Sequence, residues 1–326
     1  MDNIETKVCY SSDPGFLLPS VASIASLRSW ESGKHVKICY LGVGYSVEQK
    51  NLAREMLSEH GVEIEFVENG ALQQFSNERF NKTHVPVASL SRFLLCEAFG
   101  ASEAQLLYID GDTFFAADPG ELLSYLVPVG KLAAVEDQSS MYAKEVGRHG
   151  NAVRAYFDGI GVDASNGYFN AGIFKTSFDT WAEVSHEALE FLRRKLEVCL
   201  YHDQSAMNAV CSHRRVTLSP IWNYQSAFLP WNHGQIKRPI VCHFVGGGKP
   251  WLGDVPKWKF IAKEYNALFP ASPNAELFPI RKWSADEQRR VHSDAKFAAM
   301  RQNLLLRPRL VNRRKRFAGW LQASEI

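Results

Sequence analysis

A strand-like apolar run that ends in an acidic pair is the feature that most limits how this chain can fold. Residues 105–109 (Gln-Leu-Leu-Tyr-Ile) have the character of a buried strand, and Asp110-Gly111-Asp112 follows them directly. In open α/β sheets, ligands bind at the carboxyl ends of the strands. The run therefore predicts a buried strand that delivers two carboxylates to the ligand-binding edge of such a sheet.

Strand and helix patterns alternate along the chain, as in an α/β protein with a doubly wound sheet. We predict strands over residues 7–10, 36–41, 63–67, 106–109 and 132–135, and helices over residues 16–30, 47–59, 89–99 and 177–200. Residues 137–167 are rich in Gly, Asp, Ser and Asn and are predicted to carry a mobile flap. Residues 270–279 are predicted to form the hinge into a C-terminal appendage.

The acidic pair is suited to binding a metal ion. Alternate residues of an extended chain point to the same side, so Asp110 and Asp112 can aim two carboxylates at one divalent ion, with no side chain on Gly111 in the way. Mn²⁺ and Mg²⁺ take carboxylate oxygens and share their other positions with substrate phosphates. His243 ends an apolar run at 239–242, as a metal ligand at a strand end would.

Three glycines and a lysine follow this histidine. Residues Gly246 to Gly248 would let backbone N–H groups approach an anion, and Lys249 adds a positive charge. Taken alone, an Asp-x-Asp pair usually marks an exposed turn, and a triple glycine is usually a plain loop. The buried strand before the acidic pair favours a site for a metal and a phosphate instead.

Six blocks of sequence stand in order along about three quarters of the chain: residues 8–13, 84–92, 107–112, 168–172, 201–204 and 243–251. Together they resemble glycosyltransferase family 8, the retaining nucleotide-sugar transferases, and particularly the bacterial members that build lipopolysaccharide or lipooligosaccharide cores. The resemblance implies a GT-A fold with a Rossmann-like mixed sheet, a Mn²⁺ or Mg²⁺ ion, and a UDP-sugar donor carrying galactose or glucose. It also implies a saccharide acceptor that is lipid-linked.

The resemblance implies roles for single residues as well. Asp110, Asp112 and His243 would bind the metal. The remaining donor contacts would be made by Ser11 and Asp13 at the base and ribose, by Gly246 and Lys249 at the phosphates, and by Arg92, Asp137, Asn170, Asp203 and Gln204 at the sugar. Glu136 competes with Asp137 for its place, because the local match is loose.

Retention of configuration is compatible with two mechanisms. A carboxylate under the sugar could form a covalent intermediate, and Asp203 is the nearest carboxylate that could take this role. The family places Gln204 beneath the ring, and since an amide is a poor nucleophile we favour attack by the acceptor on the same face as the leaving group. Other interpretations stay open: Asn170 could cap a turn, Asp203 could be the N-cap of a helix over residues 204–210, and Arg92 could form a surface ion pair.

Three other functions compete with this one. A glycogenin-like protein would glucosylate its own tyrosine, but the chain has no dedicated tyrosine-bearing tail. A sugar-nucleotide pyrophosphorylase would carry a basic Gly-rich loop after its first strand, and residues 11–15 contain no basic residue. A non-catalytic binder of nucleotide sugars is disfavoured because Asp110, Asp112 and His243 are all present.

Several features indicate a cytoplasmic protein. Residues 1–7 are charged and lack the apolar stretch of a signal peptide, and no apolar run approaches the length of a membrane span. The six cysteines show no metal-binding spacing and stand mostly in apolar runs, which is typical of free buried thiols in a reducing compartment.

The charge is concentrated at the C-terminal end. Residues 281–326 hold 12 Lys and Arg against 4 Asp and Glu, so that this segment has a net charge of +8 and the remainder −6. Residues 307–316 are basic and lead into Phe317, Trp320 and Leu321. We predict a catalytic domain over residues 1–270 and, over residues 271–326, a basic amphipathic appendage that attaches to an anionic membrane surface. A solvated tail and a nucleic-acid site are the less favoured alternatives.

Overall fold

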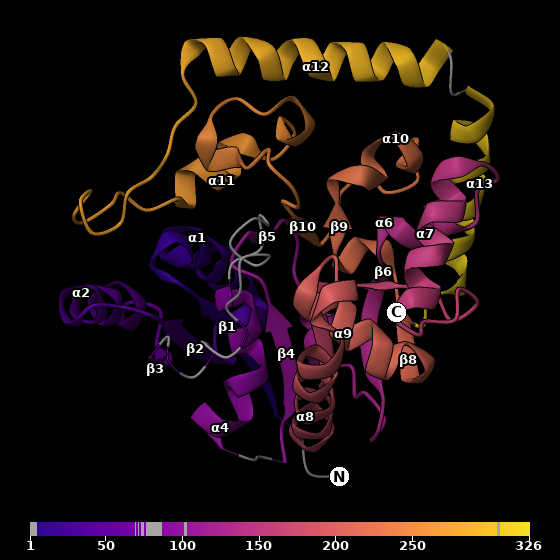
Figure 1. Cartoon of the computed structure of the whole chain (residues 1–326). Coiled ribbons are helices and arrows are strands. Elements are labelled where there is room, and N and C mark those ends of the chain that lie inside the picture. The colour runs from indigo at the N-terminus through magenta and orange to yellow at the C-terminus, as the bar shows by residue number, and fades with distance from the viewer. Residues whose placement is uncertain are drawn as a thin grey trace.

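A mixed seven-stranded sheet forms the centre of the protein (Figure 1). The computed structural model describes residues 5–68, 70, 72, 75, 87–100, 103–304 and 307–326. The strand order is β3-β2-β1-β4-β7-β6-β8. The strands are β1 (Thr6–Ser12), β2 (Lys37–Val43), β3 (Val62–Val67), β4 (Gln105–Ile109), β6 (Leu132–Glu136), β7 (Phe169–Ser177) and β8 (Arg215–Leu218). Only β7 runs antiparallel to its neighbours, β4 and β6.

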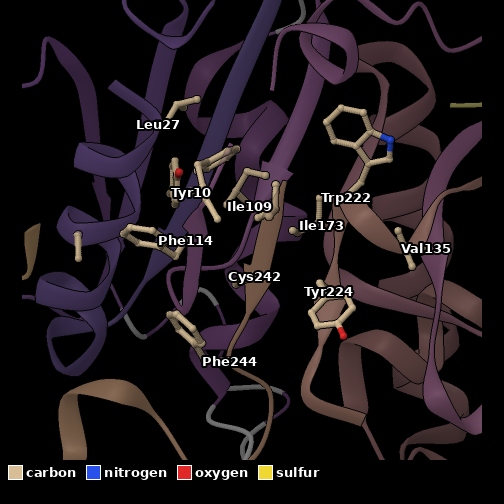
Figure 2. Packing of buried hydrophobic residues seen from close by; sticks show 14 of the residues in the cluster. Tyr10, Leu27, Ile109, Phe114, Val135, Ile173, Trp222, Tyr224, Cys242 and Phe244 are labelled. Atoms are coloured by element: carbon tan, nitrogen blue, oxygen red, sulfur yellow. The ribbon is translucent and has the colours of Figure 1, made fainter. Parts of the chain in front are cut away.

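Both faces of this sheet are buried, because its central strands are apolar at successive positions. On β4, Leu107 and Ile109 belong to one core and Leu106 and Tyr108 to the core on the opposite face. Figure 2 shows part of the first core, in which Ile109 lies near Ile173 of β7. The predicted strands over residues 7–10, 36–41, 63–67, 106–109 and 132–135 are all confirmed. Burial on both faces accounts for the apolar runs of the inner strands, whereas the edge strand β3 alternates between half-buried and exposed residues.

Helices cover the two faces. Those of the main body are α1 (Leu17–Arg28), α2 (Val47–Ser58), α4 (Leu95–Phe99), α5 (Gly120–Ser124), α6 (Gln138–Ala143), α7 (Arg148–Gly159), α8 (Phe178–Lys195), α9 (His202–Cys211), α10 (Leu229–Asn232) and α11 (Ala262–Leu268). Helix α1 packs into the first core and α8 into the second. A capping box between Ser46 and Gln49 begins α2, since each side chain accepts a hydrogen bond from the other residue's backbone N–H.

A small second sheet brings distant parts of the sequence together. It consists of β5 (Thr113–Phe115), β10 (Val241–His243) and β9 (Tyr224–Gln225), in the order β5-β10-β9. Strand β5 begins directly after Asp112 and pairs antiparallel with β10, with Thr113 opposite His243. This register places the histidine beside the acidic pair.

Two helical predictions need correction, and a third segment holds more structure than expected. Residues 89–99 do not form one α-helix: Val87–Leu94 is a 3₁₀ segment that passes into α4. The helix predicted to end at residue 200 ends as α8 at Lys195, with a 3₁₀ turn over Leu196–Val198. The segment 137–167, interpreted as a flap, contains α6 and α7. Residues 84–86 of the second matching block lie outside the described residues.

Two C-terminal helices complete the fold. Helix α12 (Ala285–Leu304) crosses the top of the view in Figure 1, and α13 (Arg307–Ala323) descends beside the main body. None of the helices among the described residues combines the length and the apolar character that a transmembrane segment requires. All six cysteines are free, as predicted, and only Cys96 is not fully buried.

The aromatic residues of the tail do not serve as the exposed membrane anchors that we predicted. Phe317 is fully buried and Trp320 is 7% exposed. Their rings pack against Phe228 and Trp231 of the main body. An apolar stripe at helical spacing covers a protein core as readily as a lipid surface, and here it covers the core.

Basic residues of the tail also dock α13 onto the body. Arg313 forms an ion pair with the buried carboxylate of Glu145 and lies over the ring of Tyr142. Arg314 and Arg316 donate to the backbone carbonyls of Pro230 and Lys144. Half of the six basic residues between positions 307 and 316 therefore hold the tail in place.

Candidate active site

Asp110, Asp112 and His243 converge at the edge of the two sheets. Their ligand atoms all lie within 4.8 Å of one another. The Nε2 atom of His243 is 3.2 Å from Asp112 Oδ1 and 3.8 Å from Asp110 Oδ2. Two carboxylates and an imidazole that face one point form a donor set suited to Mn²⁺. The residues present thus fit the metal that the sequence predicted.

A glycine of β7 makes room for this cluster. The backbone N–H of Asp110 donates to Gly172 O at 2.7 Å, so the two chains run side by side. A Cβ atom at Gly172 would overlap the His243 ring and lie 2.6 Å from Asp110 Oδ2. Only glycine fits at the end of the Phe-Asn-Ala-Gly segment without displacing metal ligands.

Gly111 has a different role from the one that we predicted. A Cβ atom there would overlap Ser20 Oγ of α1 rather than block a metal position. Glycine at this position therefore lets helix α1 pack closely against the turn that carries the two aspartates.

Buried hydrogen bonds orient Asp110. Its Oδ1 atom accepts from Arg92 and from the Tyr108 hydroxyl, both at 2.9 Å, which leaves Oδ2 turned toward His243. Arg92 is 4% exposed and also pairs with Asp203 at 3.2 Å, so the alternative of a surface ion pair is wrong. Burial raises the pKa of Asp110, and Arg92 opposes that increase.

Lys249 lies on the other side of the cluster. It forms an ion pair with Asp112 and donates to the backbone carbonyl of Phe244. Burial alone would raise the pKa of Asp112, but Lys249 and His243 hold it well below its usual range. The Asp112 carboxylate is therefore kept ionised and available to a cation.

The glycine loop between His243 and Lys249 is open. Gly246 has a φ of +80°, a left-handed conformation that favours glycine. A Cβ atom at Gly246 or Gly247 would meet nothing within 4 Å, so an anion can approach this backbone closely. At Gly248 the nearest atoms belong to Lys257.

Asn170 and Gln204 meet Asp137 in a second group of polar side chains. Asn170 Nδ2 lies 3.2 Å from Gln204 Oε1 and 3.4 Å from Asp137 Oδ2. The Gln204 oxygen also accepts from the backbone N–H of Ala171 at 3.1 Å. The competing Glu136 pairs instead with Arg215 at 3.0 Å, so Asp137 is the carboxylate that lies beside the predicted sugar-binding residues.

Two of the alternative interpretations can now be judged. Asn170 Oδ1 accepts from the backbone N–H of Gly172, but both residues lie within strand β7, so Asn170 does not cap a turn. Asp203 is not a helix N-cap, because α9 begins one residue earlier and its cap, Tyr201, makes no side-chain hydrogen bond. Asp203 instead pairs with Arg92 and lies 3.2 Å from the Ser89 hydroxyl.

Ser11 and Asp13 lie at the carboxyl end of β1, next to this edge. The Ser11 hydroxyl is 3.1 Å from the Tyr108 hydroxyl, which in turn contacts Asp110. Asp13 is partly buried, and burial raises its pKa. Tyr108 therefore connects Ser11, one of the two predicted nucleoside contacts, to the candidate metal ligand Asp110.

Sequence reasoning missed Asn223. This residue is fully buried, and both polar atoms of its side-chain amide have partners. Its Oδ1 is 2.9 Å from His243 Nδ1, and its Nδ2 donates to Asn170 Oδ1 at 2.9 Å. It joins the metal cluster to the Asn170 and Gln204 group. An asparagine within Trp222-Asn223-Tyr224 carries no motif that could have revealed this contact.

Comparisons with known sequences agree with this geometry. The profile of glycosyl transferase family 8 matches residues 7–254. General stress protein A of Bacillus subtilis (strain 168) is 24% identical over 246 residues, which cover 70% of this chain and 80% of that protein. The lipopolysaccharide glucosyltransferase WaaO of Escherichia coli (strain K12) is 23% identical over 265 residues, which cover 77% of this chain and 74% of that protein.

Solved structures share the fold. The galactosyltransferase LgtC, in complex with donor and acceptor sugar analogues, superposes with a TM-score of 0.68 over 82% of this chain and 98% of its own, at 17% identity. The bifunctional glycosyltransferase WbbM, without ligand, gives a TM-score of 0.62 over 86% of this chain and 52% of its own, at 21% identity.

Proposed function

The chain belongs to glycosyl transferase family 8 and is a glycosyltransferase with a GT-A fold, and from this premise we propose that it moves galactose or glucose from a UDP-sugar to a saccharide acceptor with retention of configuration. The observation that carries the proposal is the convergence of Asp110, Asp112 and His243 beside Lys249 and an open glycine loop. A metal-binding group and a phosphate-binding group that adjoin one another suit a nucleoside diphosphate.

The donor would lie across these two groups. Asp110, Asp112 and His243 would hold Mn²⁺ or Mg²⁺, which would stabilise the negative charge that develops on the diphosphate as it leaves. Lys249 and the backbone of Gly246 to Gly248 would bind the phosphates. Ser11 and Asp13, at the end of β1, would contact the nucleoside.

The transferred sugar would lie over the second polar group. Arg92, Asp137 and Asn170 are buried, and their polar atoms are fixed by neighbours, which suits the recognition of sugar hydroxyls. Arg92 is additionally held by the backbone carbonyl of Ala171 at 2.7 Å. Such fixed partners hold a sugar in one orientation with little loss of side-chain entropy.

We favour same-face attack over a covalent intermediate. In this route the bond from the anomeric carbon to the diphosphate oxygen breaks, the acceptor oxygen bonds on the same face, and the acceptor's proton passes to the departing phosphate oxygen. Asp203, the carboxylate that a covalent route would use, is neutralised by its ion pair with Arg92, which lowers its value as a nucleophile. Gln204 would instead stabilise the positive charge that develops on the sugar ring.

The acceptor is proposed to be a lipid-linked saccharide of the lipopolysaccharide core, by analogy with WaaO. Residues 1–270 would form the catalytic domain, and the basic residues 271–326 would associate with the anionic cytoplasmic face of the inner membrane. Two exposed apolar residues of α12 support this association, since Phe297 is 61% and Met300 52% exposed.

A donor screen tests the proposal. UDP-galactose, UDP-glucose and other nucleotide sugars would be incubated with the full chain and Mn²⁺ in the absence of acceptor, and the released sugar would be measured. We expect slow hydrolysis of one UDP-hexose, its loss in excess chelator, and release of the anomer present in the donor. Full activity in chelator, or an inverted product, would disprove the proposal.

A further inference from the structure

A hollow of about 920 Å³ lies between α12 and the catalytic body. Tyr142 of α6, Trp231 of α10 and Phe260 line its body side, and Ala295, Ala298 and Ala299 of α12 form its outer wall. Its volume is in the range of sites that hold small ligands. The outer wall begins beyond residue 254, where the family match ends.

The hollow borders on both parts of the donor site. One lining residue, Gln138, directly follows Asp137 in the chain. Another, Lys257, reaches the glycine loop: its Nζ is 3.4 Å from Val245 O, and a Cβ atom at Gly248 would lie 3.0 Å from its side chain. The hollow therefore adjoins the proposed sugar and phosphate positions, where an acceptor must approach.

The lining of the hollow is positively charged. It contains Lys257, Lys259 and Arg313 and no Asp or Glu. Arg313 is compensated by Glu145. In the part of the chain that the structure describes, Lys257 has no carboxylate within 4.0 Å, and its Nζ makes only long contacts, to Ser226 Oγ at 3.3 Å and to Val245 O. A partly buried ammonium group without a counter-ion favours an anionic ligand.

We propose that this hollow binds the acceptor and that Lys257 recognises an anionic group on it, such as a phosphate. The inference rests on the proposed function and narrows its acceptor to an acidic saccharide. The ring of Phe260, which is 48% exposed, offers an apolar surface to a sugar ring. Burial and the nearby Lys249 lower the pKa of Lys257 to about 8, and a bound anion offsets both effects.

Calorimetry with paired probes tests the inference. UDP is first titrated into the full chain with Mn²⁺, which reports on the proposed function separately. Glucose 6-phosphate and glucose are then titrated into the UDP complex. We expect glucose 6-phosphate to bind at least about 10-fold more tightly than glucose, because a hydrogen bond to a charged group contributes about 1.5–3 kcal/mol.

Three variants identify the group responsible. Lys257→Gln should lower the affinity for glucose 6-phosphate about 10-fold and leave glucose and UDP unchanged. Lys263→Gln, an exposed residue of α11 outside the hollow, should match the wild type. Ala298→Trp should fill the hollow and weaken both sugars while sparing UDP.

Two results would overturn the inference. Equal binding of glucose and glucose 6-phosphate would show that the hollow does not select an anion. A loss of UDP affinity in Lys257→Gln, with unchanged binding of glucose 6-phosphate, would assign Lys257 to the donor diphosphate instead.

Discussion

The metal cluster and the hollow beneath α12 are adjoining regions that are built in opposite ways. In the cluster, neighbouring side chains bind Asp110 and Asp112 and hold them in place. A Cβ atom at Gly172 would overlap the cluster. In the hollow, Lys257 makes only long contacts and has no carboxylate partner among the described residues. The groups proposed to perform the chemistry are thus held in place by neighbours, whereas the lysine proposed to select an acceptor is held only loosely.

The two regions also differ in their relation to the family. The metal cluster lies wholly within the matched residues 7–254, and the α12 wall lies outside them. Enzymes of one family that share a reaction but use different acceptors would share the metal site and differ at the acceptor site. This division is expected because function depends on local sites more than on the fold.

The strongest test of the comparison removes one metal ligand. Asp112→Asn keeps the shape of the side chain but loses its negative charge, so we expect transfer and donor hydrolysis to fall by about 10³-fold. Steady-state rates with Mn²⁺ measure the effect, and thermal unfolding within a few degrees of wild type is the control. Near-normal rates would mean that the cluster is not where the reaction occurs.

Gln204 tests whether the second polar group takes part in the reaction. If its amide stabilises the developing positive charge, Gln204→Ala should lower kcat by about 10²-fold with little change in the KM of the donor. Initial rates over a range of donor concentrations separate the two constants. A higher KM with normal kcat would make Gln204 a ground-state contact only.

Gly172→Ala tests how closely the metal cluster is packed. The added methyl group would meet His243 and Asp110, so we expect Mn²⁺ affinity to fall by up to about 10²-fold. Paramagnetic resonance of free Mn²⁺ measures this without substrate. Gly159→Ala is the matched control, since a Cβ atom there meets nothing within 4 Å. Equal affinities for the two variants would show that the cluster can relax.

Asn223→Ala should have a smaller effect of the same kind. Loss of the partner of His243 Nδ1 should weaken Mn²⁺ binding about 10-fold, because such partners orient the ligand ring. Asn223→Asp retains an acceptor for the ring and should recover part of the affinity. If both variants bind Mn²⁺ like the wild type, the contact does not orient His243.

The C-terminal helices should affect the chemistry least. Phe317→Ala removes a fully buried ring and should reduce the free energy of unfolding by about 3–5 kcal/mol. Phe297→Ala, at a position 61% exposed, should change it by less than about 0.5 kcal/mol. Only Phe297→Ala should weaken co-sedimentation with anionic vesicles. Both variants should retain donor hydrolysis at low temperature. Unchanged sedimentation of Phe297→Ala would contradict membrane attachment through α12.

Much of the fold could be predicted because its determinants are local. Strands β4 and β6 of the main sheet are largely apolar runs, and a strand buried on both faces requires such a run. The convergence of Asp110 and Asp112 with His243 could be anticipated for the same reason, since each follows or ends a strand. The resemblance to one family supplied Arg92, Asn170 and Gln204, which no local pattern distinguishes.

The missed features depend on long-range contacts. Asn223 becomes important only because β9 pairs with β10 and brings it to His243. Phe317 and Trp320 have a spacing that suits a lipid surface and a protein core equally well, and only the position of α10 decides between them. The 3₁₀ geometry of Val87–Leu94 likewise has no signal in its apolar pattern.

The hydrogen bonds that join His243 to Gln204 have a direction. A neutral imidazole that presents Nε2 to a metal carries its hydrogen on Nδ1, which then donates to Asn223. The Asn223 amide donates to Asn170, and Asn170 donates to the Gln204 oxygen. The Gln204 oxygen is thereby occupied by donors, which leaves its NH₂ group able to donate but not to accept. A metal at one end would thus set the polarity of the amide that is proposed to face the sugar at the other, across three intervening side-chain hydrogen bonds.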